Sequence, residues 1–345
     1  MKILILAGGL SPERDVSLVS GSLIARALAD RGHKILLADV YEGIEVGNNE
    51  ISELFTSDPA SVDAISESVP DLDAVRAKCG GRAAKIGPGV LEAAKYADAV
   101  FLALHGDMGE DGSLQATLDN YGIKKYTGSG YAGSLLAMDK DISKRMMKLS
   151  GIPTPDWMYY DVKNNTTEDI LNNIGLPCVV KPTACGSSVG VSIVHSESEL
   201  EAAIDFAASY ESKIVVEKKV TGREFSVGVL GENALPPIEI IPKSGFYDYK
   251  NKYQSGMTEE ICPAVLTEQQ TKKVQTYAKA VFDCLRLSGY ARADFIMDED
   301  GEFWCLEVNN LPGMTPMSLL PQEAAAAGIG YGELCEMIVN MAVEK

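Results

Sequence analysis

The sequence predicts a parallel α/β unit at the N-terminus, followed by a mixed α+β region. Over about the first 130 residues, short apolar runs alternate with amphipathic segments, the pattern of strands and helices in a parallel sheet. From Cys178 onward strand-like runs follow one another, and helical stretches at Glu197–Ser209 and Glu268–Leu287 interrupt them. The chain has 345 residues, more than one ordinary domain, so two or three compact units are expected.

Composition and charge limit the classes of function. Hydrophobic residues make up 46% of the chain and charged residues 23%, which is ordinary for a globular protein with a full core. The formal net charge of −18 argues against nucleic acid as a partner, because binding it requires a basic face that displaces counterions. No apolar stretch approaches the ~20 residues needed to cross a membrane, so no membrane partner is expected. The seven cysteines are scattered and never form Cys-x-x-Cys, which favours reduced thiols in a cytoplasmic protein.

The N-terminal segment is interpreted as the first strand of the α/β unit. Lys2–Ala7 is apolar but too short for a secretion signal, and it leads into a glycine pair and a charged segment. Ser11 is the expected N-cap of the following helix, with Pro12 at the first helical position. An apolar stripe at helical spacing then predicts a helix that ends at Arg31 and Gly32.

Further elements are expected along the chain. Ala99–Leu104 is a predicted strand that runs directly into His105. The polar, weakly periodic segment at residues 43–89 is interpreted as an insertion of helices and loops, with no assigned function. Residues 151–155 connect to the mixed region. The strands expected there are Cys178–Lys181, Val189–Val194, Ile214–Glu217, Glu224–Leu230 and Ile238–Ile241.

One glycine-rich motif matches the dinucleotide-binding fingerprint only in part. Residues 128–133 match G-x-G-x-x-G and precede a helical pattern, so a dinucleotide site has to be considered. That fingerprint also requires an acidic residue ~20 positions further on, at the end of a second strand. Residues 148–153 instead have the pattern of a helix end and a turn, and no G-x-x-x-x-G-K-[S/T] sequence occurs in the chain. A Rossmann oxidoreductase therefore rests on this motif alone, and P-loop enzymes are excluded.

A second glycine-rich stretch, at residues 180–191, fits a phosphate-binding loop. Two β-branched runs flank its small residues, so the loop is expected between two strands. Backbone amides of glycine and serine exposed there can surround phosphate oxygens, and Lys181 adds a positive charge. A plain hairpin with small turn residues explains the same stretch equally well.

A hairpin near the C-terminus favours the phosphate interpretation. Tyr290–Met297 alternates as a strand with Arg292 and Asp294 on one face, and the return strand places Glu307 and Asn309 on one face. Two carboxylates and an amide are the hard oxygen ligands that Mg²⁺ prefers. The neighbouring arginine can stabilise charge on a transferred phosphoryl group or a tetrahedral carbon. A solvated polar face is the alternative, and the polar loop that follows the hairpin argues against it.

Six motifs in one order extend this interpretation along nearly the whole chain. They lie at residues 8–17, 104–112, 138–140, 186–190, 246–253 and 307–315. In these motifs the chain resembles the D-alanine–D-alanine ligases of the ATP-grasp superfamily, apart from the insertion at residues 43–89. The resemblance implies an N-terminal Rossmann-like parallel α/β domain followed by a two-part ATP-grasp fold. The expected parts are residues 1–128, a central subdomain at 129–216, and a C-terminal subdomain at 217–345 with the metal and substrate site.

The resemblance implies an ATP site between the two sheets of the ATP-grasp fold. The implied ligands are Lys140, Lys181 and Ser188 for the phosphates, Glu217, Lys218 and Val220 for adenine, and Glu224 for the ribose. Asp294, Glu307 and Asn309 would bind two Mg²⁺ ions, with Mn²⁺ as an alternative metal.

The resemblance also implies a reaction through an acyl phosphate. Glu13 would neutralise the ammonium group of the first D-alanine, with His105 as a nearby helper. A first-turn acid favoured by the helix dipole and an ordinary loop histidine are the structural alternatives for these two residues. The carboxylate of the first D-alanine would attack the γ-phosphate of ATP. The amine of the second D-alanine would then displace phosphate.

Further residues are implied for the second substrate and for the displacement step. Arg292 and the Gly313 amide would stabilise the oxyanion, while Ser318 and the Leu319 amide would hold the carboxylate of the second D-alanine.

A loop at residues 246–253 resembles the segment that closes over the site in this family. Lys252 would face phosphate and the substrate carboxylate, and Tyr253 would bond to Ser187, which in turn meets Glu13. Such closure would keep water from the acyl phosphate. Relatives that make D-alanyl-D-lactate or D-alanyl-D-serine often depart from this lysine–tyrosine pairing, so D-alanine is favoured as the second substrate.

Two alternatives to the dipeptide ligase stay open. One is a ligase of the same family with D-lactate or D-serine at the second position, and the other is a non-catalytic ATP-binding regulator on this fold. The intact metal ligands and Arg292 argue against the regulator. The resemblance further implies a cytoplasmic homodimer that supplies peptidoglycan precursors in a bacterium.

Overall fold

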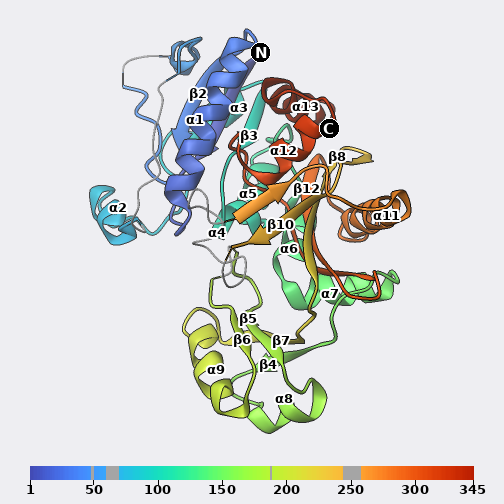
Figure 1. Ribbon diagram of the computed structural model, residues 1–345. Coiled ribbons are helices and arrows are strands. Elements are labelled where there is room, and N and C mark those ends of the chain that lie inside the picture. The colour runs from blue at the N-terminus through green and yellow to red at the C-terminus, as the bar shows by residue number, and fades with distance from the viewer. Residues whose placement is uncertain (48–49, 60–69, 187–188, 244–257) are drawn as a thin grey trace. The chain divides into compact units, whose positions relative to one another are not determined.

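Two compact units make up the chain in this computed structural model (Figure 1), which describes residues 1–47, 50–59, 70–186, 189–243 and 258–345. The first unit comprises Met1–Ser134, Leu287–Ala291 and Asn310–Lys345, and the second comprises Leu135–Arg286 and Arg292–Asn309. The predicted site residues that lie outside the described residues are Ser187, Ser188, Lys252 and Tyr253. In the described ranges no helix is both long and apolar enough to cross a membrane.

A three-stranded parallel sheet forms the centre of the first unit, as the sequence predicts. Its strands are β1 (Lys2–Ala7), β2 (Lys34–Asp39) and β3 (Ala99–Leu102), in the order β2-β1-β3. The bounds predicted for β1 are confirmed, and its residues from Ile3 onward are completely buried, as expected of the middle strand of a parallel sheet. β3 ends two positions earlier than predicted, because the ladder stops where β1 turns into the glycine pair.

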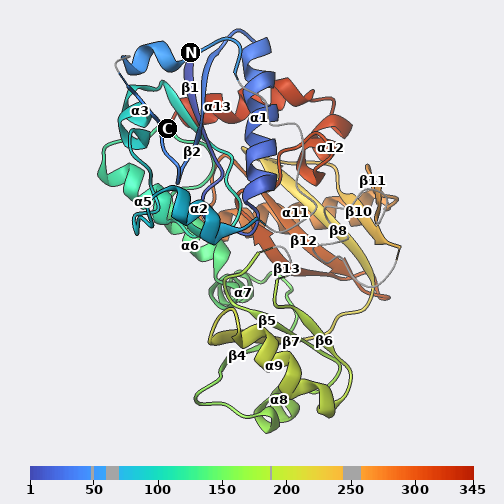
Figure 2. The same ribbon diagram turned by 90° about the vertical axis from the view of Figure 1, so that its left-hand side faces the viewer.

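Helices flank this sheet (Figure 2). α1 (Arg14–Asp30) packs against β1 and β2 and against α13 (Tyr331–Val343), and α13 also contacts β3. α1 ends where predicted, since Gly32 follows its C-cap with a left-handed φ of +87°. The other helices of this unit are η1 (Ile51–Leu54), α2 (Leu72–Lys78), α3 (Val90–Tyr96), α4 (Asp107–Glu110), α5 (Ser113–Asn120) and α12 (Leu319–Ala326), and α6 (Tyr131–Met138) begins in it. The described part of the predicted insertion contains the short helices η1 and α2, as expected.

The start of α1 differs from the prediction. Ser11 is not the N-cap and Pro12 is not the first helical residue: the helix begins at Arg14, with Glu13 at the N-cap position. Ser11 Oγ accepts a hydrogen bond from the Glu13 N–H at 3.1 Å, and the Ser11 carbonyl accepts one from the Arg14 N–H at 3.0 Å. The serine therefore stabilises a turn before the helix, the local arrangement that competes with helix capping.

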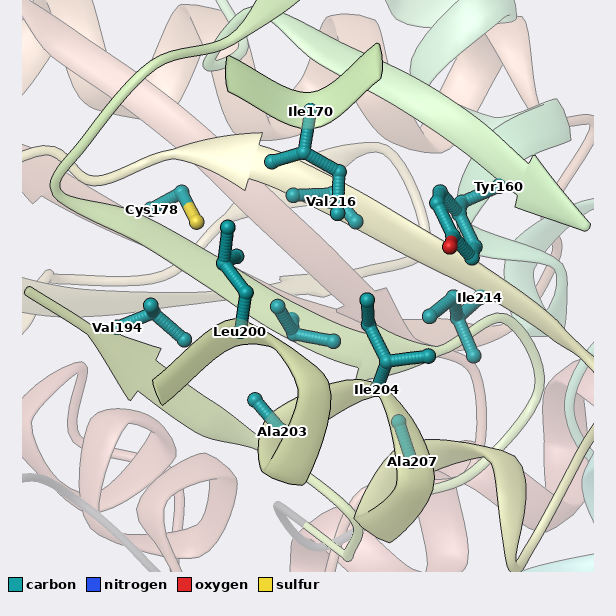
Figure 3. Close-up of a cluster of buried hydrophobic side chains, with 11 residues drawn as sticks. Tyr160, Ile170, Cys178, Val194, Leu200, Ala203, Ile204, Ala207, Ile214 and Val216 are labelled. Carbon is teal, nitrogen blue, oxygen red and sulfur yellow. The ribbon is translucent and has the colours of Figure 1, made fainter. Parts of the chain in front are cut away.

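The second unit contains a small antiparallel sheet with the strand order β4-β7-β5-β6. Its strands are β4 (Trp157–Asp161), β5 (Cys178–Pro182), β6 (Ser192–Val194) and β7 (Lys213–Lys218). Figure 3 shows Ile170 of α8 (Thr167–Asn173) and Leu200 of α9 (Leu200–Ala208) in one buried cluster with Val216 of the sheet. The short helix η2 (Glu197–Glu199) precedes α9. β6 begins later than the predicted Val189, because Gly190 takes a left-handed φ of +72° in a turn.

A six-stranded sheet completes the second unit, with the order β11-β10-β8-β12-β13 and with β9 paired to β8. Its strands are β8 (Arg223–Leu230), β9 (Asn233–Ala234), β10 (Ile238–Pro242), β11 (Thr258–Ile261), β12 (Tyr290–Met297) and β13 (Phe303–Asn309). α11 (Glu268–Cys284) packs on β8, and α7 (Lys140–Leu149) contacts β13. α11 ends before the predicted Leu287, because Arg286 adopts a left-handed φ of +56°. A parallel sheet in one unit and antiparallel sheets in the other confirm the predicted fold class.

Candidate active site

A pocket in the second unit collects most of the residues predicted to bind ATP and metal. Its cavity of about 530 Å³ is within the range of small-ligand sites. The predicted residues that line it are Lys140, Lys181, Glu217, Lys218, Val220, Glu224, Asp294 and Glu307. Apolar walls come from both sheets of the unit, through Val179 and Ile193 on one side and Ile241, Ile296 and Leu306 on the other. The pocket therefore combines an apolar slot with lysines and carboxylates.

Glu217 carries a buried ion-pair network at the wall of this pocket. Its side chain is only 4% exposed, and its two carboxylate oxygens contact different lysines. Lys181 Nζ donates to Oε1 at 2.6 Å, and Lys144 Nζ lies 2.7 Å from Oε2. Burial opposes the charge on Glu217, but the two lysines outweigh it and hold the pKa of this carboxyl below its usual range. The Glu217 side chain is thus a counterion for two lysines.

The predicted metal ligands face one another across the β12–β13 hairpin. In the register of the two strands Asp294 pairs with Glu307, and Arg292 pairs with Asn309. Directly opposite residues of an antiparallel pair share a face of the sheet, so all four side chains are on the same face, as predicted. A register shift directly after Asp294 marks a β-bulge, a feature often found beside active sites.

Each hairpin carboxylate is held by a cation. Arg292 donates to both oxygens of Asp294 at 2.9 Å, and Ser226 of β8 donates to Asp294 Oδ1 at 2.8 Å. Lys140 Nζ lies 3.5 Å from a Glu307 oxygen, and it also donates to the Cys185 carbonyl at 2.6 Å. Each carboxylate therefore has a cation within ion-pair distance.

The donor set suits Mg²⁺ but is incomplete by itself. Among the described residues, no group of three or more histidine, cysteine, aspartate or glutamate side chains is placed to hold a metal. Asp294 and Glu307 supply two carboxylates, and Asn309 adds an amide oxygen. Mg²⁺ is typically bound through one or two carboxylates together with substrate phosphates, so this set fits a metal that arrives with a nucleotide.

Other predicted residues gather in the first unit. Glu13 and His105 are both buried, at 8% and 6% exposure. A Cβ on Gly106 would lie 3.1 Å from a Glu13 carboxylate oxygen, so this carboxylate reaches the residue next to His105. His105 Nδ1 lies 3.2 Å from the carbonyl oxygen of Leu311. The loop that carries Gly313 therefore packs against the histidine loop.

Gly313, Ser318 and Leu319 are close together after β13. A Cβ on Gly313 would lie 2.9 Å from Ser318 Oγ, so the two residues are in close contact. Ser318 Oγ accepts from the Thr315 N–H at 3.1 Å, and Ser318 is the N-cap residue of α12. Leu319 is the first residue of that helix, so its amide N–H has no partner within the helix. The first unit thus brings together its five predicted residues, from the segments at 11–13, 105–110 and 310–319.

Two polar residues that contact predicted site residues were not predicted from the sequence. Lys144 contacts Glu217, and Ser226 contacts Asp294, and both side chains are completely buried. Lys144 follows Lys140 by one helical turn, and this i,i+4 spacing could have drawn attention to it. For Ser226 no signal exists in the sequence, because its partner is on a strand far along the chain.

Comparisons with known proteins indicate the same family that the sequence motifs predict. The family profile described as D-ala D-ala ligase N-terminus matches residues 2–129, and the one described as D-ala D-ala ligase C-terminus matches residues 146–340. The chain is 43% identical to D-alanine–D-alanine ligase from Pediococcus pentosaceus, covering 98% of this chain and 97% of that protein. It is 41% identical to the ligase of the same name from Lacticaseibacillus casei, covering 99% and 95%.

Solved structures of the same kind superpose on the whole chain. The Bacillus anthracis D-alanine–D-alanine ligase complexed with ATP matches with a TM-score of 0.76 and 31% identity, covering 100% of this chain and 98% of that one. The enzyme from Coxiella burnetii matches with a TM-score of 0.76 and 26% identity, covering 100% and 94%.

The fold and the pocket together define the class of protein. A parallel α/β unit, with two antiparallel sheets that line a pocket of lysines and carboxylates, is the architecture of an ATP-grasp ligase. Within that class, the chain belongs to the D-alanine–D-alanine ligase family. The family membership that the six motifs predict is confirmed.

Proposed function

We propose that the chain joins two D-alanines into D-alanyl-D-alanine, using ATP and a divalent metal, through a D-alanyl phosphate. The observation that carries this proposal is the pocket of the second unit, where the predicted nucleotide and metal ligands line a single cavity. The names of the full-length relatives support the same reaction. They do not favour the D-lactate and D-serine alternatives or a non-catalytic regulator.

ATP is assigned to that pocket. Lys140 and Lys181 bind its phosphates together with Ser188, and Glu224 holds the ribose. Adenine takes the apolar slot, beside the backbone of residues 217–220. This assignment agrees with the paired side chain of Glu217, with the lysines near the hairpin carboxylates and with the ATP complex of the Bacillus anthracis relative. The predicted adenine contacts Glu217, Lys218 and Val220 remain part of the proposal.

Asp294, Glu307 and Asn309 are proposed to hold two Mg²⁺ ions, or Mn²⁺ in their place. When bound, the metal neutralises phosphate charge and so makes the γ-phosphorus easier to attack. Arg292 on the same face stabilises negative charge on the transferred group. The bidentate bond from Arg292 to Asp294 keeps both side chains on that face.

The first step makes the acyl phosphate. Glu13 binds the ammonium group of the first D-alanine, with His105 beside it, which leaves the substrate carboxylate free. A carboxylate oxygen attacks the γ-phosphorus of ATP, the bond to the β-γ bridging oxygen breaks, and ADP leaves. The burial of Glu13 and its closeness to the His105 loop support this role.

The second step forms the peptide bond. The neutral amine of the second D-alanine attacks the acyl carbon, the C–O bond to phosphate breaks, and the amine loses a proton. Arg292 and the Gly313 amide stabilise the oxyanion, and Ser318 with the Leu319 amide binds the incoming carboxylate. The contact between Gly313 and Ser318 supports a shared role in this step.

Closure and specificity are proposed from the family resemblance. Lys252 and Tyr253 are assigned to the closing loop that excludes water, with Tyr253 bonded to Ser187 of the phosphate loop, and Tyr253 favours D-alanine as second substrate. A homodimer formed through the N-terminal domain, cytoplasmic location and a role in peptidoglycan precursor synthesis belong to the same proposal. The division into residues 1–128, 129–216 and 217–345 also remains a proposal. All seven cysteines are free thiols, which is compatible with a reducing compartment.

The test couples ADP release to mass spectrometry of the products. The enzyme is given ATP, Mg²⁺ and D-alanine alone, and then D-alanine mixed with D-lactate or D-serine. One ADP for each D-alanyl-D-alanine, with little mixed product, is expected. Predominantly mixed product would contradict the assignment of Tyr253, and ATP binding without turnover would favour the regulator.

A further inference from the structure

Lys144 is a buried cation behind the nucleotide pocket. It lies in α7 and is 0% exposed, and it is not among the residues that line the pocket. Its Nζ is 2.7 Å from Glu217 Oε2 and donates to Thr154 Oγ1 at 2.7 Å. The other oxygen of Glu217 accepts from Lys181, which does line the pocket. Lys144, Glu217 and Lys181 thus form a chain of contacts from the interior to the pocket wall.

Stability alone does not account for a lysine at this position. Burial lowers the pKa of Lys144, against the effect of Glu217, because the charged ammonium loses its hydration. Glu217 already has a partner in Lys181, so a second buried ammonium is not needed to neutralise it. Buried ion pairs are often replaceable by apolar residues without loss of stability. A functional reason for the charge is therefore to be sought in the pocket.

The charges of the three residues supply that reason. Two ammonium groups and one carboxylate give this group of three residues one net positive charge, with Lys181 and Glu217 at the pocket wall and Lys144 behind them. Without Lys144, Glu217 would neutralise Lys181 entirely, and the carboxylate would lose the contact that fixes its second oxygen. Both changes weaken the attraction of the wall for an anion, since charges at low dielectric interact strongly.

We propose that Lys144 is a positioning residue for nucleotide binding, which holds Glu217 from behind so that Lys181 is oriented and left with its full charge for the phosphates of ATP. This inference rests on the proposed assignment of the pocket to ATP. Lys144 itself does not line the pocket.

The experiment is a double-mutant cycle on ATP affinity, measured by calorimetry without D-alanine. Lys144→Met is expected to weaken ATP binding about tenfold in the wild-type background, and less than about twofold in a Lys181→Met background. The KM for D-alanine at saturating ATP is expected to stay within about twofold. An equal loss in both backgrounds would mean that Lys144 acts only as a structural residue and would overturn the inference.

Lys148→Met is the matched control. Lys148 is one turn further along α7 and is exposed, and both lysines lie over the ring of Trp157, at 5.8 Å for Lys144 and 5.6 Å for Lys148. Lys148 has no described contact with Glu217. Unchanged ATP affinity is expected, so loss of a positive charge beside Trp157 would not by itself explain the effect of Lys144→Met. An equal loss in the control would overturn the inference.

Thr154→Val keeps the test valid if Lys144→Met does not fold. It removes the hydroxyl that accepts from Lys144 and keeps every charge, so ATP binding about two- to threefold weaker is expected, again only when Lys181 is present. Wild-type affinity in Thr154→Val would then overturn the inference. Absence of ATP binding by the wild type would overturn the proposed function and the inference together, whereas equal binding by wild type and Lys144→Met would overturn the inference alone.

Discussion

Asp294 of β12 lies directly opposite Glu307 of β13, and a different cation holds each carboxylate. Arg292 binds Asp294 through two hydrogen bonds, while Lys140 approaches Glu307 from α7. Two carboxylates side by side repel one another when ionised, and the cations offset this repulsion. Each carboxylate of the pair therefore has its own cationic partner.

Removal of one carboxylate is expected to weaken metal binding. Asp294→Asn keeps the shape of the side chain but removes its charge, so Mn²⁺ in the presence of ATP is expected to bind at least about tenfold more weakly. Titration followed by electron paramagnetic resonance measures the free ion directly. Glu299→Gln, in the exposed turn of the same hairpin, is the control and is expected to bind Mn²⁺ as the wild type does. Equal affinity in Asp294→Asn would rule out this carboxylate as a ligand.

A methyl group at Gly313 is expected to impair the second step of the reaction. The new Cβ would lie 2.9 Å from Ser318 Oγ, so one of the two residues has to move. Gly313→Ala is expected to lower kcat/KM for the second D-alanine about tenfold, through a displaced amide and a displaced serine. ATP affinity, measured separately, is expected to stay unchanged. Gly330→Ala is the control, because its Cβ would meet no atom within 4 Å. An equal kinetic loss in the control would remove the steric explanation.

The β12–β13 hairpin shows what the sequence predicts well. Alternation with period two is a local property, so the pattern around Arg292 and Asp294 gave the correct strand bounds and the correct face. The register beside the turn followed from the short connection, but the register shift after Asp294, which brings Glu307 opposite Asp294, did not. The two strands and the residues that share a face within each were therefore predictable, and their binding of a metal stays a prediction.

Contacts between distant segments were not predictable in the same way. Lys144 is charged, and nothing local indicates that it is buried against Glu217 of another strand. Ser226 in β8 bonds to Asp294 for the same nonlocal reason. The predicted start of α1 was also wrong. The Ser11 hydroxyl can accept a hydrogen bond either as a helix cap or within a turn, and only the folded structure determines which of the two forms.

The stability of the first unit is expected to fall in acid through Glu336. A side-chain bond from Arg31 and then one from His33 hold the pKa of this carboxyl below its usual range, and they join the end of α1 to α13. Because the folded state has the lower pKa, the unfolded chain binds more protons as the pH falls below the ordinary glutamate range, so acid favours unfolding. The stabilisation is present above the unfolded pKa and is lost as the pH falls through the folded value.

Glu336→Gln is expected to remove this part of the acid dependence. The unfolding midpoint in urea, followed by circular dichroism from neutral to acid pH, is expected to decline less steeply in the variant than in the wild type. Glu336 is partly exposed to solvent, so the difference is expected to shrink at high salt. Glu344→Gln, near the end of the same helix, should behave as the wild type. Identical pH profiles for the wild type and Glu336→Gln would contradict the assignment.

Gly222 is expected to be irreplaceable at the entry to β8. It lines the pocket of the second unit, and a Cβ there would lie 2.0 Å from the carbonyl oxygen of Met297 at the end of β12. A backbone carbonyl in a paired strand cannot rotate away, so Gly222→Ala has to separate the strands. A loss of about 1–3 kcal/mol in the free energy of unfolding is expected.

Urea denaturation and ATP titration together test this prediction. If the strands separate, ATP affinity falls with stability, because β8 and β12 both line the pocket. Gly332→Ala is the control: its Cβ would meet its nearest atom at 3.4 Å, an ordinary contact, and its place inside α13 favours alanine. That variant is expected to be as stable as the wild type or slightly more so. A fully stable Gly222→Ala would mean that the close approach of the two strands is not required for the pocket.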